Sequence, residues 1–593
     1  MHDGKDHLPP TAAPWRRRLG APRLGFPRWA RDHPGRLVYG SNESGAWEVY
    51  AWDRSTGVRR QVTDRPGGTT LFAIDPGGDR IWWFDDTSGD ERGRWMIESF
   101  DGSSRTRASR ALGPAYHAGL VLARRFALIG TSDDEGTTIS LLPSDGAPRP
   151  LYRHRRHAML ETLDREERFF AIRHSEDGSA MHMGLRVLDL EGRTRAELPS
   201  EPGVALRAGA WSPLAGDYRL LITRDVLGAA RPAVWTPLTG AVDGLDIDLP
   251  GEVSCLGWYP DARSVLLLHG YRARTELFRY DLHSGACVRL ELPRGTVTDA
   301  RVRTDGALCY EWSDSRTPPG VYRGSRLLLS PEEGPGPDGV PYRDLWLGDL
   351  HAFVAEPPGP GPHPTVFLIH GGPIAHHADA FNPRVQAWVD HGFAVALVNY
   401  RGSSGYGGAW RDAIIGNPGF GELEDLGAVR DLLVKEGTAD PARLLLVGHS
   451  WGGYLALLGA GLEPDRWSLA IADAPVADYE AAYADEMDAL KMLDNALFGG
   501  SPEQLPELYR ERSPLTYVER VKVPLLILAA ANDPRCPIRQ IENYLTRLEE
   551  LGKPHEVLRL DFGHGAHVTG DVIRKVETQI DFAARHLGTT EPM

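Results

Sequence analysis

A unit of 39 to 48 residues recurs along the N-terminal half of this 593-residue chain. In residues 37–59 the unit consists of an apolar strand, a turn, an alternating strand and a closing turn that ends in Gly57. Corresponding turns end at six further glycines: Gly102, Gly146, Gly192, Gly240, Gly285 and Gly324. Repeats of this length with several short strands are typical of β-propellers, whose blades bury their faces against their neighbours. The repeat predicts a seven-bladed β-propeller over residues 35–330, after an N-terminal extension of residues 1–34; a pair of β-sandwiches is the alternative.

The pattern changes after residue 330. Two Pro/Gly-rich connectors, residues 330–341 and 356–364, flank a short alternating stretch. From residue 365 onward, apolar runs that end in Gly, Asp, Ser or His alternate with helical patterns. Such alternation indicates a parallel sheet with helices on both faces, and the ligand site of this kind of sheet lies at the carboxyl ends of its strands. Residues 331–593 are therefore predicted to form a second domain.

The sequence GHSWG at residues 448–452 fits the motif G-x-S-x-G. It follows an apolar run and precedes a segment rich in Gly, Ala and Leu, which is the strand-turn-helix context of a nucleophile elbow in an α/β-hydrolase. The turn is sharp, so the flanking glycines leave room for the side chain of Ser450. The bare motif is common by chance, but this context indicates that Ser450 is a nucleophile and that the second domain is an α/β-hydrolase.

A serine hydroxyl is a weak nucleophile, so the motif predicts a base and an acid later in the chain, in the order Ser, Asp, His. Asp533 and His564 each follow an apolar run. We expect His564 to take the proton of Ser450 and Asp533 to orient the imidazole. The competing base is His567, and three carboxylates compete for the acid: Asp473, Asp478 and Asp561.

Six motifs follow one another through about 250 residues: HGGP at 370–373, NYRGSSGYG at 399–407, GHSWGGY at 448–454, Ser513-Pro514, DPRCP at 533–537 with Gln540, and GHG at 563–565. Their order and spacing resemble the catalytic domain of the prolyl oligopeptidase family of serine peptidases, and most closely its acylaminoacyl-peptidase branch. The resemblance implies a triad of Ser450, Asp533 and His564. It also implies a β-propeller ahead of the catalytic domain, in agreement with the repeat.

The resemblance further implies an oxyanion hole. One donor would be the backbone N–H of Trp451, and the second would be either the hydroxyl of Tyr406 or a backbone N–H at Gly371-Gly372. Three residues that follow the next predicted strand are candidates for the substrate pocket, with the core of a lid helix as the alternative: Tyr479, Tyr483 and Met487. Cys536 stands where relatives usually carry Val, which predicts sensitivity to thiol reagents.

Other conspicuous residues are interpreted structurally. The pair Glu166-Glu167 invites comparison with the glutamates that hold a free α-amino group in dipeptidyl relatives, but its context predicts a solvated turn between blade strands. His376 and His377 are adjacent and do not share a face, so a metal pair is not expected. The Arg-rich residues 16–36 are interpreted as a strap across the domains.

Charge excludes several classes of function. With 66 Lys and Arg against 81 Asp and Glu, the net charge is −15, which disfavours general binding to nucleic acid or anionic membranes. The four cysteines form neither a zinc pattern nor a disulfide framework, and the sequence has no apolar run long enough to span a membrane. We therefore expect a cytoplasmic protein without a metal or cofactor; a homo-oligomer is compatible with the sequence.

The leading hypothesis is a serine peptidase that acts through an acyl-enzyme on short peptides, with N-acylated peptides among the candidates and with the propeller restricting access. The alternative is an amide or ester hydrolase that acts on a small acylated metabolite on the same scaffold. A third hypothesis, a non-catalytic binding module, conflicts with the intact set of triad residues.

Overall fold

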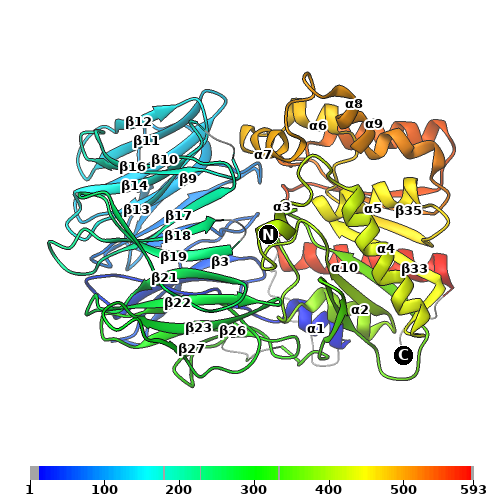
Figure 1. Cartoon of the computed structure of the whole chain (residues 1–593), viewed down its shortest axis with the longest axis horizontal. Coiled ribbons are helices and arrows are strands. Elements are labelled where there is room, and N and C mark those ends of the chain that lie inside the picture. Colours follow the sequence, from blue (N-terminus) through cyan, green and yellow to red (C-terminus); the bar gives the residue numbers. More distant parts are fainter. Residues whose placement is uncertain (1–12, 178–179, 227–228, 332–333, 335, 589–593) are drawn as a thin grey trace.

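The computed structural model describes residues 13–177, 180–226, 229–331, 334 and 336–588, and in it a β-propeller and an α/β domain lie side by side (Figure 1). The propeller has seven four-stranded antiparallel blades, as predicted from the repeat. Blade 1 contains β1 (Arg28–Trp29), β2 (Arg36–Ser41), β3 (Glu48–Asp53) and β4 (Arg59–Gln61), and blade 2 contains β5 (Phe72–Ile74), β6 (Arg80–Asp85), β7 (Arg92–Ser99) and β8 (Arg105–Arg107).

The next five blades follow in chain order. Blade 3 contains β9 (Ala115–Leu122), β10 (Phe126–Asp133), β11 (Gly136–Pro143) and β12 (Arg149–His154). Blade 4 contains β13 (Ala158–Leu163), β14 (Phe169–His174), β15 (Gly184–Asp189) and β16 (Thr194–Leu198), and blade 5 contains β17 (Val204–Trp211), β18 (Leu220–Val226), β19 (Ala229–Thr236) and β20 (Ala241–Gly244). Blade 6 contains β21 (Glu252–Trp258), β22 (Ser264–Tyr271), β23 (Arg274–Asp281) and β24 (Cys287–Arg289), and blade 7 contains β25 (Thr296–Val302), β26 (Leu308–Ser313), β27 (Gly320–Arg323) and β28 (Arg326–Leu329).

The ring closes through side-chain packing between the first and last blades. Each blade consists of consecutive strands, so no strand is exchanged between blades 1 and 7. Instead, Leu37 and Tyr39 of blade 1 share a buried cluster with Cys309, Val321 and Leu329 of blade 7. Burial of apolar surface between neighbouring blades therefore holds both the blades and the ring.

The α/β domain is built on one mixed sheet of eight strands in the order β29-β30-β32-β31-β33-β34-β35-β36. The two edge strands β29 (Arg343–Leu347) and β30 (Leu350–Ala355) are antiparallel, and the remaining six pair in parallel: β31 (His363–Ile369), β32 (Ala394–Asn399), β33 (Ala439–His449), β34 (Leu469–Asp473), β35 (Leu525–Ala530) and β36 (His555–Leu560). The predicted parallel sheet is thus confirmed, and the fold is a propeller followed by an α/β domain.

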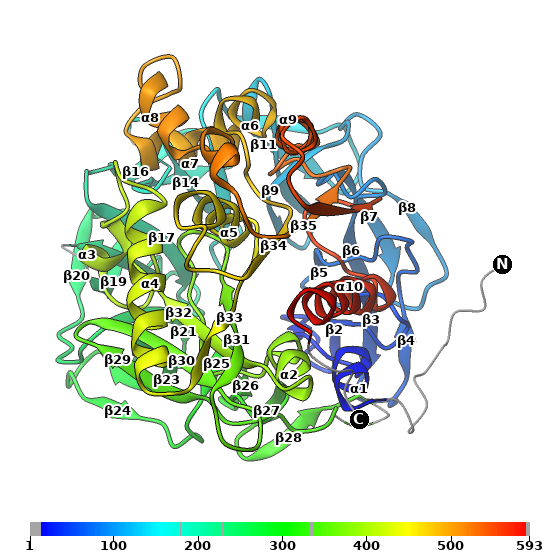
Figure 2. The ribbon, with the colours of Figure 1, turned by 90° about the vertical axis from the view of Figure 1, so that its right-hand side faces the viewer.

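Helices cover both faces of this sheet (Figure 2). One face packs against α4 (Phe420–Lys435), α5 (Trp451–Leu462) and α9 (Ile538–Glu550), and the other packs against α2 (Pro383–Asp390) and α10 (Thr569–Leu587). Short helices connect the remaining strands: α3 (Gly408–Asp412), α6 (Tyr479–Asp485), α7 (Asp488–Phe498), α8 (Pro506–Arg512) and the 3-10 helix η1 (Pro514–Arg520). None of the helices in the described part of the chain has the length and hydrophobicity of a membrane span.

The N-terminal segment contacts both domains. Helix α1 (Pro14–Gly20) places Trp15 and Leu19 in the core beneath α2 and α10, and Arg18 pairs with Asp390. Strand β1 then joins blade 1, N-terminal to residue 35 where the sequence places the start of the propeller. The Arg-rich segment therefore packs across the domains, which agrees with its interpretation as a strap.

Glu422 in the first turn of α4 is a fully buried carboxyl group. It accepts the backbone N–H of Gly419 at 2.8 Å, yet burial raises the pKa of Glu422 to about 8. In the unfolded chain a Glu titrates near pH 4.3. Between these values the folded protein holds a proton that the unfolded chain has released, so stability falls as the pH rises.

The variant Glu422→Gln keeps the acceptor for Gly419 and removes this titration. We expect the stability of the variant relative to wild type to increase between pH 5 and 8, by at most about 1.4 kcal/mol per pH unit, and to level off above pH 8. Thermal unfolding at pH 5, 6, 7, 8 and 9 measures the difference. A difference that does not change with pH would show that Glu422 ionises normally.

Candidate active site

Ser450 occupies a strained turn between β33 and α5. Strand β33 ends at His449, helix α5 begins at Trp451, and the backbone of Ser450 has φ 57° and ψ −121°. A positive φ is uncommon for a residue with a side chain and is concentrated at functional sites. A Cβ atom added at Gly448 would lie 2.2 Å from the backbone of Gly452. The glycines of the motif thus permit the tight turn that the sequence predicts.

Asp533 and His564 meet at the carboxyl ends of neighbouring strands. Asp533 follows β35 and His564 follows β36, and Nδ1 of His564 lies 2.7 Å from Oδ2 of Asp533. The other oxygen of Asp533 accepts the backbone N–H groups of Arg535 at 2.8 Å and Cys536 at 2.9 Å. Burial alone raises the pKa of Asp533, but His564 and these N–H groups outweigh it and lower the pKa below its usual value. Asp533 is therefore an ionised carboxylate that orients the imidazole.

Ser450 lies at the same end of the sheet as this pair. The ring of its neighbour His449 is 4.8 Å from the ring of His564, and the side chain of Cys536 shares a hydrogen bond with Ser450. The polar side-chain atoms of Asp533, Cys536 and His564 lie within 4.8 Å of one another. The structure thus gathers the three predicted triad residues into one cluster.

A metal ion is one conceivable occupant of this cluster, because carboxylate, thiol and imidazole are all metal ligands. Burial raises the pKa of Cys536 well above its usual value, so the sulfur carries a proton. Asp533 already directs one oxygen to His564 and the other to two backbone N–H groups. The donors therefore suit a hydrogen-bonded Asp-His pair better than a metal site.

A buried ion pair beside the cluster was not apparent from the sequence. Nζ of Lys575 on α10 lies 2.6 Å from Oδ2 of Asp473, and Nδ1 of His449 lies 3.2 Å from the same oxygen. The backbone carbonyl of Asp473 also accepts the N–H of Ser450 at 2.8 Å. Removing one partner of a buried pair costs about 3–5 kcal/mol. Asp473, a competing acid in the sequence, thus supports the serine turn through both its backbone and its side chain.

The other competing residues have different contacts. Asp478 caps α6 through the N–H of Ala481 and accepts from Asn543 at 2.9 Å. His567 lies three residues beyond His564, and its carbonyl accepts the backbone N–H of Trp47. Asp561 lines a cavity between the domains together with His564 and His567.

The residues interpreted structurally from the sequence also have defined partners. Glu166 accepts the backbone N–H of Gly216 at 2.9 Å, and Glu167 accepts from Arg31 at 2.9 Å. Nδ1 of His376 lies 3.0 Å from Oγ of Ser404, whereas Nε2 of His377 lies 2.9 Å from the carbonyl oxygen of Leu368. The two histidines are therefore directed to different groups.

The loop after β31 lies against the serine turn. A Cβ atom added at Gly371 would lie 3.3 Å from Cβ and 3.9 Å from Oγ of Ser450, and Gly372 follows with φ +134°. Since Trp451 is the first residue of α5, its backbone N–H points out of the helix N-terminus beside the same serine. Backbone N–H groups of both segments are thus available near Ser450.

The hydroxyl of Tyr406 belongs to a separate buried network. It accepts from Nδ2 of Asn399 at 2.7 Å and lies 2.5 Å from Nδ1 of His351. Burial lowers the pKa of His351 to about 4, so the ring is neutral, and its Nε2 lies 3.1 Å from a carboxylate oxygen of Asp344. The ring proton therefore sits on Nε2, and Nδ1 accepts the single proton of Tyr406.

The three candidate pocket residues occupy different environments. Tyr479 is fully buried and packs edge-on against Tyr454, so it is a core residue. The hydroxyl of Tyr483 donates to Asn495 at 3.1 Å. Met487, in contrast, lines the cavity between the domains, and its backbone N–H donates to the carbonyl of Pro534 in the Asp533 loop.

Two buried carboxyl groups lie next to these residues. Burial and its neighbour Asp494 raise the pKa of Glu486 to about 10, and burial raises the pKa of Asp494 to about 7. At neutral pH at least one of the two groups is protonated, which allows them to share a hydrogen bond. Neither residue has a signal in the sequence, because their proximity depends on how α7 packs.

A family model described as the prolyl oligopeptidase family matches residues 379–590. These residues include the serine turn and both members of the Asp533–His564 pair. The α/β domain belongs to the prolyl oligopeptidase family. The resemblance stated from the sequence motifs is thereby confirmed.

Curated relatives match over the same part of the chain. The acylamino-acid-releasing enzyme of Rattus norvegicus is 31% identical over 252 residues, which are 40% of this chain and 33% of that protein. The dipeptidyl aminopeptidase BIII of Pseudoxanthomonas mexicana is 31% identical over 215 residues, 34% of this chain and 30% of that protein. The chain thus spans about a third of the length of the curated relatives it matches.

Solved structures match over nearly the whole chain. A puromycin hydrolase is 23% identical with a TM-score of 0.82, and the match covers 98% of this chain and 97% of that one. The acylaminoacyl peptidase of Pyrococcus horikoshii is 17% identical with a TM-score of 0.73 and covers 98% of both chains. At these identities the matches establish the fold, a propeller joined to a prolyl oligopeptidase domain.

The loop that carries His564 is attached to the propeller. The backbone N–H of Trp47 donates to the carbonyl of His567 at 2.9 Å, and the N–H of Thr569 donates to the carbonyl of Gly45 at 2.8 Å. A Cβ atom added at Gly563 would lie 1.7 Å from the carbonyl oxygen of Gly89, so only glycine permits this contact. The propeller therefore holds the histidine loop of the prolyl oligopeptidase domain.

A cavity of about 530 Å³ opens between the domains at this point. His564 and Met487 line it from the prolyl oligopeptidase domain, and loops of blades 1 and 2 line it from the propeller. Arg535, two residues after Asp533, crosses the boundary and pairs with Glu91 of the propeller at 2.6 Å. The candidate active site is thus enclosed by both domains.

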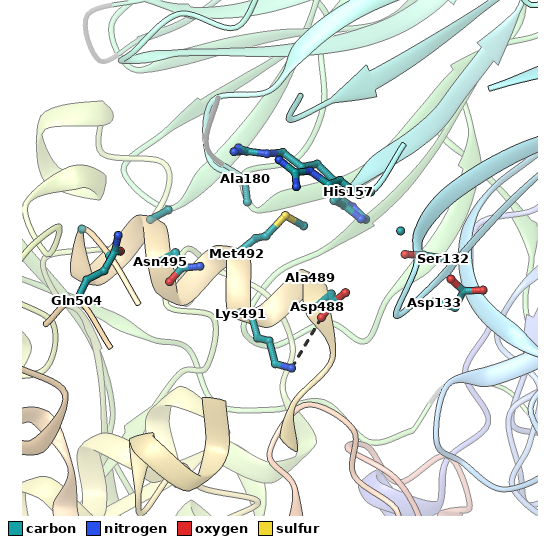
Figure 3. A pocket seen from close by; sticks show the side chains of 16 residues that line it. Ser132, Asp133, His157, Ala180, Asp488, Ala489, Lys491, Met492, Asn495 and Gln504 are labelled. Carbon is teal, nitrogen blue, oxygen red and sulfur yellow. Dashed lines mark ion pairs between the residues drawn. The ribbon is translucent and has the colours of Figure 1, made fainter. Parts of the chain in front are cut away.

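A second cavity, of about 520 Å³, lies between α7 and the loops of blades 3 and 4 (Figure 3). Met492 and Asn495 line it from the helix, and Ser132 and His157 line it from the propeller. This cavity and the one at His564 lie on opposite sides of the segment that carries Met487, because that residue immediately precedes α7.

Proposed function

We propose that the chain is a serine peptidase that hydrolyses short peptides through an acyl-enzyme. The observation that carries the proposal is the Asp533–His564 hydrogen bond of 2.7 Å beside the strained turn of Ser450. An ionised carboxylate, an imidazole held through Nδ1 and an exposed serine hydroxyl form the constellation that activates serine in hydrolases on many folds.

In the proposed reaction, Nε2 of His564 removes the proton of Ser450 as Oγ attacks the carbonyl carbon of the substrate. Asp533 fixes the imidazole tautomer and stabilises the imidazolium that forms. His564 then returns the proton to the leaving amine, and an acyl-enzyme remains on Ser450. Water attacks the acyl-enzyme by the reverse sequence of proton transfers, releasing the acid.

We assign the oxyanion hole to backbone donors: the N–H of Trp451 and an N–H of the Gly371-Gly372 loop. Both segments lie beside Ser450, and backbone donors need no side-chain rearrangement during the reaction. Tyr406 is excluded from this role in the proposal, because its only proton is donated to His351.

The cavity supports a short substrate with a blocked N-terminus. A volume of about 530 Å³ is in the range of small-ligand sites, so it suits a short peptide and not a folded protein. Two of the three carboxylates that line it are engaged: Glu91 with Arg535, and Asp86 with backbone N–H groups of its own turn. This arrangement disfavours a free ammonium group and agrees with the acylamino-acid release for which the rat relative is named.

The second candidate is an amide or ester hydrolase acting on a small acylated metabolite. The observation that favours it is the solved relative described as a puromycin hydrolase, which covers nearly the whole chain. The same residues would perform the same proton transfers, so substrate preference decides between the two proposals.

A panel of chromogenic substrates tests the proposed function. We expect an acetyl-aminoacyl p-nitroanilide to have the highest kcat/KM, above a free dipeptidyl p-nitroanilide, an internal X-Pro peptide and a simple p-nitrophenyl ester. The physical reason is that a neutral acetyl group avoids leaving an ammonium ion unpaired in the cavity.

The serine-to-alanine variant Ser450→Ala serves as the control for contaminating hydrolases and should show no turnover of any substrate. If the wild-type enzyme hydrolyses only the esters, the peptidase proposal fails. If the free dipeptidyl substrate is preferred by tenfold or more, the assignment of a blocked N-terminus is wrong.

The substitution Tyr406→Phe tests the assignment of the oxyanion hole. Removing one oxyanion donor typically lowers kcat by about 100- to 1000-fold. Because we assign the hole to backbone groups, we expect Tyr406→Phe to reduce kcat/KM by less than about tenfold and to lower the melting temperature by loss of the buried hydrogen bonds. A loss of 100-fold or more without a change in melting temperature would return Tyr406 to the oxyanion hole.

A further inference from the structure

The two ends of the propeller channel face different surroundings. The N-terminal ends of the inner strands face the prolyl oligopeptidase domain, as shown by Glu252 of β21, which accepts the N–H of Gly405 at 3.1 Å, and by Thr296 of β25, which donates to the carbonyl of Asp379 at 2.9 Å. The C-terminal ends of the same strands lie at the opposite face of the propeller. This outer mouth holds a cavity of about 520 Å³.

The lining of the outer cavity is cationic and aromatic. Its charged side chains are four arginines: Arg31, Arg165, Arg301 and Arg303. Three tryptophans from blades 1, 5 and 6 also line it: Trp29, Trp211 and Trp258. Within the described part of the chain no Asp or Glu lines the cavity, although the protein as a whole has a net charge of −15. The outer mouth is therefore a positive site on an acidic protein.

Several donors in this cavity lack a hydrogen-bond acceptor among the described residues. They are Nη1 of Arg165, Nε and Nη1 of Arg303, and the indole Nε1 atoms of Trp29 and Trp211. The carboxylates nearest to two of the arginines lie outside hydrogen-bond distance, Asp32 at 3.6 Å from Arg165 and Asp305 at 3.7 Å from Arg303. Buried donors normally have an acceptor. Their number here indicates an acceptor supplied by a ligand.

The arginines are held in place by the segment between β1 and β2. Arg31 of this segment pairs with Glu167 of blade 4 at 2.9 Å, and the neighbouring Asp32 pairs with Arg124 of blade 3 at 2.9 Å. Arg303 donates to the carbonyl of Pro34 at 3.2 Å. The segment thus crosses the mouth from blade 1 to blades 3 and 4, so the cavity is enclosed on its outer side.

We propose that the outer mouth of the propeller is a binding site for a small polyanion with two or more phosphate or carboxylate groups. Guanidinium groups bind both kinds of oxyanion through paired N–H donors, and the tryptophans supply an apolar wall for the rest of the ligand. The site lies at the far end of the propeller from Ser450, and the proposal does not depend on the proposed peptidase activity.

Titration with inorganic pyrophosphate and with citrate, at constant ionic strength set with NaCl, tests the proposal. Intrinsic tryptophan fluorescence reports occupancy because three tryptophans line the cavity, and calorimetry gives the stoichiometry. We expect saturable binding of one anion per chain. Stronger binding of pyrophosphate would assign the natural ligand to phosphates, and stronger binding of citrate would assign it to carboxylates.

The variants Arg301→Gln and Arg165→Gln should each weaken binding by about tenfold or more, since each removes a charged donor. Arg107→Gln on the exposed strand β8 changes the net charge equally and should leave the affinity unchanged. The melting temperatures of the variants report whether they are folded. Absence of saturable binding to the wild-type protein, or equal affinity in Arg301→Gln and wild type, would overturn the proposal.

Discussion

The hydrogen bond between Asp533 and His564 depends on the order of strands in the parallel sheet. Neighbouring strands lie about 4.8 Å apart, so the loops after β35 and β36 leave the sheet side by side and their side chains meet. Strand β34 separates this pair from β33, which carries the serine turn. That intervening strand is not a passive spacer, because the carbonyl of Asp473 at its end accepts the N–H of Ser450. One edge of one sheet therefore positions the nucleophile, its support and the pair that activates it.

The propeller completes what the sheet begins. The loop that contains His564 has no regular structure between β36 and α10, and its backbone donates to or accepts from Trp47 and Gly45 of the propeller. The contact of Gly563 with Gly89 is close enough that any other residue at 563 would displace it. The same contacts enclose the cavity of about 530 Å³ next to His564. Catalytic geometry and restriction of substrate size thus have a common structural origin in the interface between the domains.

The sequence predicts those features that repeat or that have local motifs. The closing turns reveal seven blades, and the glycines around Ser450 reveal the elbow because their steric role is local. Contacts between distant segments leave no such pattern: Lys575 lies about 100 residues from Asp473, and nothing near it in the chain indicates an ion pair. The direction of a side chain is equally hidden. Tyr406 lies within a recognisable motif, but its hydroxyl is determined by the neutral ring of His351, which comes from an edge strand.

The most direct test of this account is the position of covalent modification by a fluorophosphonate, mapped by mass spectrometry of tryptic peptides. We predict one adduct per chain, on Ser450, with activity lost in proportion to labelling. His564→Gln should slow the labelling, and a control variant at the exposed propeller serine Ser284→Ala should not. Labelling of another serine in step with the loss of activity, or undiminished labelling of Ser450→Ala, would contradict the assignment of the nucleophile and the mechanism built on it.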